Sequence, residues 1–189
     1  MNSIWGSALF SRPTTAVVLL LAVFAAVNAQ AKVFYSQSEA LELAFPRAEK
    51  VASNTFILDD DQVERIESLA KCELDSKLVK IYTGMREGEV LGYALIDVHN
   101  VRTLPEAFMI VLSPAGEVRS LRVLAFHEPL EYKPTSRWYA QFDNQSIEAP
   151  LRVGGDIHGV VGATLSAHAT TRGVRRALAY YEILLQSEN

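Results

Sequence analysis

The first part of the hydrophobic pattern predicts two short helices. Ser36 and Glu39 form a capping box that opens a helix through Ala44. Residues 59–71 repeat apolar positions at helical spacing behind three consecutive aspartates. Acidic side chains are favoured by the dipole at a helix N-terminus. We therefore interpret these aspartates as helix capping rather than as a metal site, since no further ligands follow at calcium-loop spacing.

The spacing changes at Leu78, where four segments rich in Val, Ile, Leu and aromatic residues follow one another. Turn-forming residues separate these segments, which are Leu78–Tyr82, Val90–Val98, Ala107–Leu112 and Val118–Phe126. The turn signals are residues 84–88, 100–105 and 113–116. The last two segments predict a hairpin, so we expect a largely antiparallel sheet. Gly92, inside the second segment, indicates a bulge or a close approach of backbone.

The pattern ends in an amphipathic helix. Apolar residues between Val174 and Leu185 recur at helical spacing with charges opposite, which predicts a helix over residues 169–186. The predicted fold class is therefore α+β, with a largely antiparallel sheet, flanking helices and this C-terminal amphipathic helix. We expect one domain over residues 32–189.

Residues 127–150 are the least regular part of this domain. Trp138, Tyr139 and Phe142 stand there among polar residues. Two interpretations stay open: the aromatic side chains fix a long loop to the sheet, or the loop packs over a ligand.

The N-terminal residues have the pattern of an export signal. Arg12 precedes an unbroken apolar run at residues 16–27, and small residues follow it up to Ala31. A spanning helix needs about 20 apolar residues, and this run is shorter. We expect residues 1–31 to be a signal peptide, cleaved rather than retained as a membrane tether, and the mature chain to be periplasmic.

Composition excludes several classes of function. The chain has 18 basic and 22 acidic residues without a long basic block, so we expect no nucleic-acid partner. Cys72 is the only cysteine, which excludes an internal disulfide, attached c-type haem and a thiolate metal cluster. We expect Cys72 to be a small, partly buried apolar residue.

The segment before the last helix combines small residues with hydroxyls. Gly162 and Ala163 leave the backbone open to a bulky flat group, and Thr164 follows them where a helix begins. Free N–H groups and the positive dipole end at such a start suit a phosphate. For Thr170 and Thr171 we expect helix capping instead.

These residues also carry a resemblance to a known family. Gly162-Ala163-Thr164-Leu165-Ser166 followed by an amphipathic helix resembles the signature of the FMN-binding domain. That domain occurs in the Rnf and sodium-translocating NADH:quinone oxidoreductase complexes and in the nitrous oxide reduction regulators. The similarity extends to five further segments: Ala44-Phe45-Pro46, Gly92-Tyr93-Ala94, the Ser-Pro-Ala-Gly turn, Phe126-His127-Glu128-Pro129, and Gln141-Phe142. It implies that a flavin transferase joins FMN through its phosphate to Thr164.

The chain departs from the family pattern at two positions. Val161 stands where the family usually has Ser or Thr, and His158 stands where it usually has an acidic residue. The candidate cofactor-binding residues are Thr164, Gly162, Ala163, Leu165, Ser166, Val161, His158, Glu128 and Trp138. No catalytic residue and no metal ligand is assigned, since neighbouring residues such as His127 and Glu128 face opposite sides of a strand.

Three functions stay open at this level. The resemblance favours an exported carrier of FMN that passes electrons between redox partner proteins, with membership of a membrane electron-transfer complex as one setting. An FMN-dependent periplasmic reductase of a small substrate is the second, with the loop from Trp138 to Phe142 shaping its pocket. A flavin-free sensory or structural member of the family is the third.

Overall fold

The computed structural model describes residues 32–186, which form a six-stranded antiparallel sheet in the order β1-β6-β5-β4-β3-β2. The strands are β1 (Lys32–Val33), β2 (Lys50–Ile57), β3 (Leu78–Arg86), β4 (Glu89–Asn100), β5 (Pro105–Leu112) and β6 (Val118–Phe126). The helices are α2 (Gln37–Ala44), α3 (Asp60–Ala70), α4 (Ser136–Tyr139) and α5 (Thr164–Leu184), with 3-10 turns η1 (Leu130–Tyr132) and η2 (Ala140–Phe142). The α+β class and the antiparallel sheet are confirmed. The predicted export signal lies outside the described residues.

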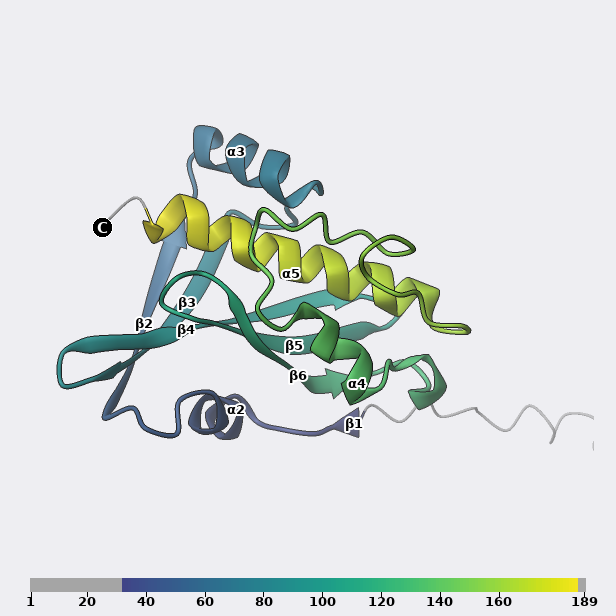
Figure 1. Ribbon diagram of the computed structural model, residues 1–189, viewed down its shortest axis with the longest axis horizontal. Helices are drawn as coiled ribbons and strands as arrows, with labels where there is room; N and C mark the ends of the chain where they lie inside the picture. The colour runs from purple at the N-terminus through teal and green to yellow at the C-terminus, as the bar shows by residue number, and fades with distance from the viewer. Residues whose placement is uncertain (1–31, 187–189) are drawn as a thin grey trace, which may run out of the picture.

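The sheet carries helices on both faces (Figure 1). Helix α5 lies along one face with α3 beside it, and α2 lies on the opposite face. Alternation along β4 explains this arrangement, because successive side chains of a strand point to opposite faces. Tyr93 and Leu95 belong to the core beneath α5, whereas Ala94 and Ile96 face α2.

Several predicted elements are confirmed. Both short helices begin with a capping box, the first at Ser36 with Glu39 and the second at Asp59 with Gln62. The hairpin of β5 and β6 is present. The pairing of β3 with β4 shifts register beside Gly92, and a Cβ at Gly92 would lie 2.4 Å from the Leu112 carbonyl oxygen, so this glycine marks a bulge and a close approach together.

Three predictions about element boundaries are wrong. The pattern missed β2, an edge strand that is mostly exposed. The turn between β3 and β4 is only Glu87-Gly88, at φ of 53° and 84°, so Gly84 lies inside β3. Helix α5 begins at Thr164, five residues before the predicted start at residue 169.

The early start of α5 also overturns the capping role of two threonines. Thr170 and Thr171 lie inside the helix and are buried, and Thr171 Oγ1 donates to the Ala167 carbonyl at 2.7 Å. The helix is also less amphipathic than predicted. Arg175 and Arg176 are both buried. Arg175 is covered by the end of α3 and by the loop before α5, to whose carbonyl groups it donates, and Arg176 faces Asp97 of the sheet.

The irregular loop is fixed to the core by its aromatic side chains. Trp138, Tyr139 and Phe142 are buried, and the Trp138 ring lies edge-on to both of the others. The single cysteine, Cys72, is partly buried, as expected. Within residues 32–186, no helix has the length and apolar character needed to span a membrane.

Candidate functional site

Thr164 is the first residue of α5, and its side chain is exposed. Gly162 at φ 81° and the bond from the Ala163 N–H to the Val160 carbonyl form the turn that starts the helix. Thr164 Oγ1 donates to that same carbonyl at 3.3 Å. No side chain caps α5, so the N–H groups of its first turn are left for another partner.

A shallow groove of about 260 Å³ contains Thr164. It is lined by Gly162 to Ser166 from the start of α5, by Val101 and Arg102 from the turn between β4 and β5, and by Tyr132 from η1. The Arg102 guanidinium lies 5.1 Å from the centre of the Tyr132 ring. The groove therefore combines a hydroxyl, unpaired helix N–H groups and a cation.

Glu128 does not line this groove but stabilises the turn that carries Arg102. Its Oε1 accepts hydrogen bonds from the backbone N–H groups of Thr103 at 2.8 Å and Leu104 at 3.0 Å. The bond from Thr103 is the main reason that the pKa of Glu128 is lowered below its usual value, and the charge of Arg102 adds to the effect. These hydrogen bonds let Glu128 hold the turn that carries Arg102.

Ser166 fixes the opposite wall. Its side chain is fully buried, and Oγ donates to the Tyr132 carbonyl oxygen. Leu165 beside it is about half exposed, at 53%. One hydroxyl of the motif thus holds η1 in place, while that of Thr164 stays accessible.

Four of the predicted binding residues do not line the groove: Glu128, Val161, His158 and Trp138. His158 and Trp138 contact each other instead: Trp138 Nε1 donates to the His158 carbonyl at 2.6 Å. Gln141 Oε1 accepts from the His158 backbone N–H at 2.8 Å and lies 2.7 Å from its Nδ1. Val161 is completely exposed beside Gly162. Their proposed contacts with a cofactor stay predictions.

Sequence reasoning missed Arg102 and Tyr132. Arg102 lies in the segment that the sequence marks only as a turn, and Tyr132 lies in the irregular region. No spacing rule links either residue with Thr164, because the sheet and the fold of the loop bring them together. The only local signal is the Glu128 segment, which the resemblance had marked.

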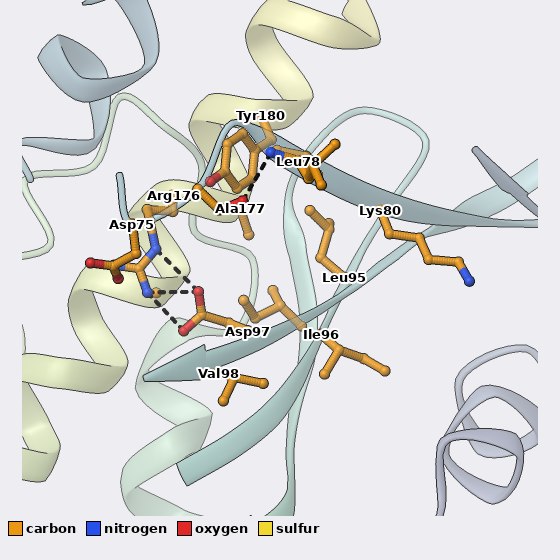
Figure 2. Close-up of a pocket in the computed structure, with 14 residues that line it drawn as sticks. Asp75, Leu78, Lys80, Leu95, Ile96, Asp97, Val98, Arg176, Ala177 and Tyr180 are labelled. Atoms are coloured by element: carbon orange, nitrogen blue, oxygen red, sulfur yellow. Dashed lines mark hydrogen bonds and ion pairs between the residues drawn. The ribbon is translucent and has the colours of Figure 1, made fainter. Parts of the chain in front are cut away.

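A second polar cluster is buried between the sheet and the middle of α5. Figure 2 shows Arg176 of α5 reaching Asp97 of β4 beside a cavity of about 160 Å³. Arg176 Nη2 donates to both Asp97 oxygens, at 2.6 and 2.8 Å. His99 Nδ1 lies 2.7 Å from Asp97 Oδ2, and its Nε2 lies 3.4 Å from Oε2 of the fully buried Glu106.

Charge complementarity governs the pKa values in this cluster. Burial alone would raise the pKa of Asp97, but the hydrogen bond from His99 and the charge of Arg176 outweigh it and lower the pKa. Burial alone would lower the pKa of His99, but its interactions with Asp97 and Glu106 prevail and raise it. Burial raises the pKa of Tyr139, whose hydroxyl donates to Glu106 at 3.3 Å. The cluster binds α5 to the sheet as a set of opposite charges.

The fold and the groove together define an α+β domain with an anion-suited groove at the exposed start of its last helix. No family model matches the sequence. The chain is 26% identical over 139 residues to one component of the Na⁺-translocating ferredoxin:NAD⁺ oxidoreductase complex of Acetobacterium woodii. The match covers 65% of this chain and 64% of that component, so it leaves about a third of the relative unmatched. The similarity is consistent with the resemblance to the FMN-binding domain of Rnf complexes.

Proposed function

We propose that this chain carries FMN, joined by a phosphoester to Thr164, and passes electrons between redox partners outside the cytoplasm. The observation that carries the proposal is the exposed Thr164 hydroxyl at an uncapped helix start, in a groove shared with Arg102. The similarity to a component of an electron-transfer complex supports it. Maturation would require a flavin transferase, and a membrane electron-transfer complex is the proposed setting.

The groove suits a phosphate for two independent reasons. The unpaired N–H groups and the dipole at the start of α5 favour negative charge, by about 0.3–1 kcal/mol for an exposed group. Arg102 adds a cation that can donate two hydrogen bonds to phosphate oxygens. Attachment would replace the Thr164 hydroxyl hydrogen by the phosphoryl group, with net loss of one water between chain and FMN.

The groove also leaves room for a flat ring system. A Cβ at Gly162 would meet no atom within 4 Å, so this turn is open to solvent. The exposed side chains of Val161 and Leu165 and the ring of Tyr132 offer apolar surface around it. Bound FMN would supply one- or two-electron transfer, and the protein would set its exposure and its surroundings.

The electron carrier is preferred over the reductase for a structural reason. The reductase hypothesis relies on Trp138 and Phe142 to shape a substrate pocket. Both side chains are buried against each other and the core. They therefore fix the loop, and the groove at Thr164 is open rather than enclosed.

The proposal is tested by exporting the chain together with a flavin transferase. We expect an intact mass increased by one FMN minus water, and a yellow colour that remains after denaturation. Thr164→Ala should abolish both, while Thr171→Ala, whose hydroxyl is buried, should keep the covalent flavin in the folded fraction. A colourless chain of unmodified mass would contradict the proposal and favour a flavin-free member. Colour that is lost on denaturation would contradict only the covalent bond.

A further inference from the structure

A second groove, of about 320 Å³, runs beside the outer edge of β6. Strand β1 is only two residues long and pairs with just Phe126 and Ala125 at one end of β6. The chain then leaves the sheet after Phe34 and Tyr35. Most of the outer edge of β6 is thus not covered by β1, whose short arrow is visible in Figure 1.

The backbone of this edge is unpaired over five residues. At one end Val118 pairs with Asn144 and Gln145, and at the other the N–H groups of Phe34 and Tyr35 donate to the Leu124 carbonyl. Between these points no further backbone group among residues 32–186 pairs with residues 119–123 on the outer edge. Half of the polar backbone groups of an edge strand point outward and can pair with another chain.

The groove follows the strand edge rather than one face of the sheet. Leu121, Arg122 and Val123 all line it, although Arg122 pairs with Met109 on the α2 side and Leu121 pairs with Ile110 on the α5 side. Consecutive residues of a strand point to opposite faces, so only an opening at the edge is lined by all three. This shape fits an extended segment of chain.

The groove is basic, in a chain whose formal net charge is −4. Arg122 and Lys133 line it, and no acidic residue does. Arg122 lies 5.3 Å from the Tyr35 ring centre and Lys133 lies 5.6 Å from that of Phe34. Neither cation forms an ion pair within residues 32–186. Lys133 also donates one hydrogen bond, to the Pro134 carbonyl at 3.3 Å. Stacking on rings positions the two cations, and both keep further N–H groups that can donate to a ligand.

The basic groove lies next to the proposed flavin site. Lys133 lines the basic groove, and its neighbour Tyr132 lines the groove of Thr164. Ser166 of α5 donates to the Tyr132 carbonyl and fixes this boundary. A chain bound along β6 would therefore lie beside Thr164.

We propose that this groove binds an acidic, extended segment of a partner protein, which pairs with the open edge of β6 and contacts Arg122 and Lys133. Its placement beside Thr164 would orient a redox partner, a consequence that rests on the proposed function. Addition of a strand to a sheet edge supplies affinity through main-chain hydrogen bonds, and charged side chains supply selectivity.

The test uses a defined probe, the peptide acetyl-Glu-Val-Glu-Val-Glu-amide, titrated into the exported chain by calorimetry and amide NMR. We expect saturable binding that weakens as salt increases, with shifts at residues 119–123. The double variant Arg122→Gln/Lys133→Gln should bind at least about tenfold more weakly, because charged hydrogen bonds are lost. Lys80→Gln is the matched control: it removes an exposed cation that also stacks on a ring, that of Tyr82, but lies on β3 outside this groove, and it should change affinity less than about twofold.

Two further titrations keep the result decisive if the double variant fails to fold. A peptide N-methylated at alternate amides should lose most of its affinity for the unmodified chain, and inorganic phosphate should compete only weakly. Equal binding of the methylated peptide, of phosphate alone or of a peptide with Lys in place of Glu would overturn the proposal, as would no binding at low salt. All titrations are repeated with Thr164→Ala, so that a failure of flavin attachment is distinguishable from a failure of peptide binding.

Discussion

The groove at Thr164 and the buried cluster at Arg176 lie on the same helix, yet they are built in opposite ways. At the start of α5 the hydroxyl of Thr164 is exposed and its one hydrogen bond is long, at 3.3 Å. Three turns further along, Arg176 makes short bonds to Asp97, and both side chains are almost completely covered. The buried cluster holds the helix against the sheet, so its first turn can stay open for a ligand.

Polar residues in the buried cluster and in the exposed groove therefore respond differently to substitution. A buried charge is costly unless it is paired and hydrogen-bonded, so Asp97, His99 and Arg176 depend on one another. Exposed groups such as Thr164 and Arg102 are solvated and can be changed at little cost to folding. Substitutions in the cluster should therefore reduce stability, whereas substitutions in the groove should reduce flavin attachment.

The largest effect on stability is expected for Asp97→Ala. This change leaves Arg176 buried without its anion and His99 with Glu106 alone, so the free energy of unfolding should fall by about 3–5 kcal/mol. Denaturant unfolding followed by circular dichroism measures it. Asp60→Ala is the matched control, because Asp60 pairs with Lys77 at the surface and should leave stability unchanged. Equal losses for both variants would contradict the dependence on burial.

A smaller loss of stability is expected at Gly173, where α5 lies close to the sheet. A Cβ at Gly173 would lie 2.6 Å from the Phe108 ring and 2.7 Å from an Asp97 carboxylate oxygen. Gly173→Ala should therefore overpack the interface and reduce the free energy of unfolding by about 1–3 kcal/mol. Gly159→Ala, where an added Cβ meets nothing within 4 Å, serves as the control. Thermal unfolding that is unaltered by Gly173→Ala would show that the helix can shift outward freely.

Sequence patterns predicted the parts of this fold whose causes are local. Capping boxes and turn residues act over a few positions, so the helices at Ser36 and Asp59 and the β5–β6 hairpin were predicted correctly. Strand β2 was missed because an exposed edge strand lacks a clear apolar alternation. The start of α5 was missed because its first turns are rich in Ser, Thr and His, and burial by the loop replaces the apolar spacing that a sequence can show.

The groove and the buried cluster also differ in how much of their composition is visible as a local sequence signal. Thr164, which the structure places in a groove, could be singled out from the sequence, because its motif is contiguous and resembles a family signature. Arg102 could not, because a turn stabilised by Glu128 brings it to the groove from a distant part of the chain. Asp97, His99 and Arg176 carry no local signal, since their charges would be expected to face solvent. Such pairings depend on which helix crosses which strand.

The buried cluster should also determine how the stability of the fold depends on pH. The pKa of His99 is raised above its usual value. Its interactions therefore stabilise the fold fully below about pH 6.5, and this stabilisation is lost as the pH rises through the higher pKa of the folded state. The pKa of Asp97 is lowered below its usual value. Its interactions therefore stabilise the fold fully above about pH 3.8, and this stabilisation is lost as the pH falls through the lower pKa of the folded state. Glu106 and Arg176 complete the charges around them.

We therefore expect the melting temperature to be highest between about pH 4 and 6.5 and to fall by a few degrees as the solution becomes alkaline. His99→Gln should flatten the alkaline side of this profile. His168→Gln, at an exposed position of α5, should leave it unchanged. An alkaline slope that survives in His99→Gln would assign the pH dependence to another group.

The smallest effect on stability is expected in the Thr164 groove. Arg102 is exposed and stacks on Tyr132, so Arg102→Gln should change the free energy of unfolding by less than about 0.5 kcal/mol. If Arg102 receives the phosphate, the same variant should lower the fraction of chain that acquires covalent flavin during co-export with a transferase, as measured by intact mass. Arg137→Gln, at an exposed position of α4 outside the groove, is the control and should match the unchanged chain. Full flavin attachment in Arg102→Gln would leave the helix N–H groups as the only phosphate partners in the groove. A loss of stability comparable to that of Gly173→Ala would instead mean that the groove, like the cluster, helps to hold α5 in place.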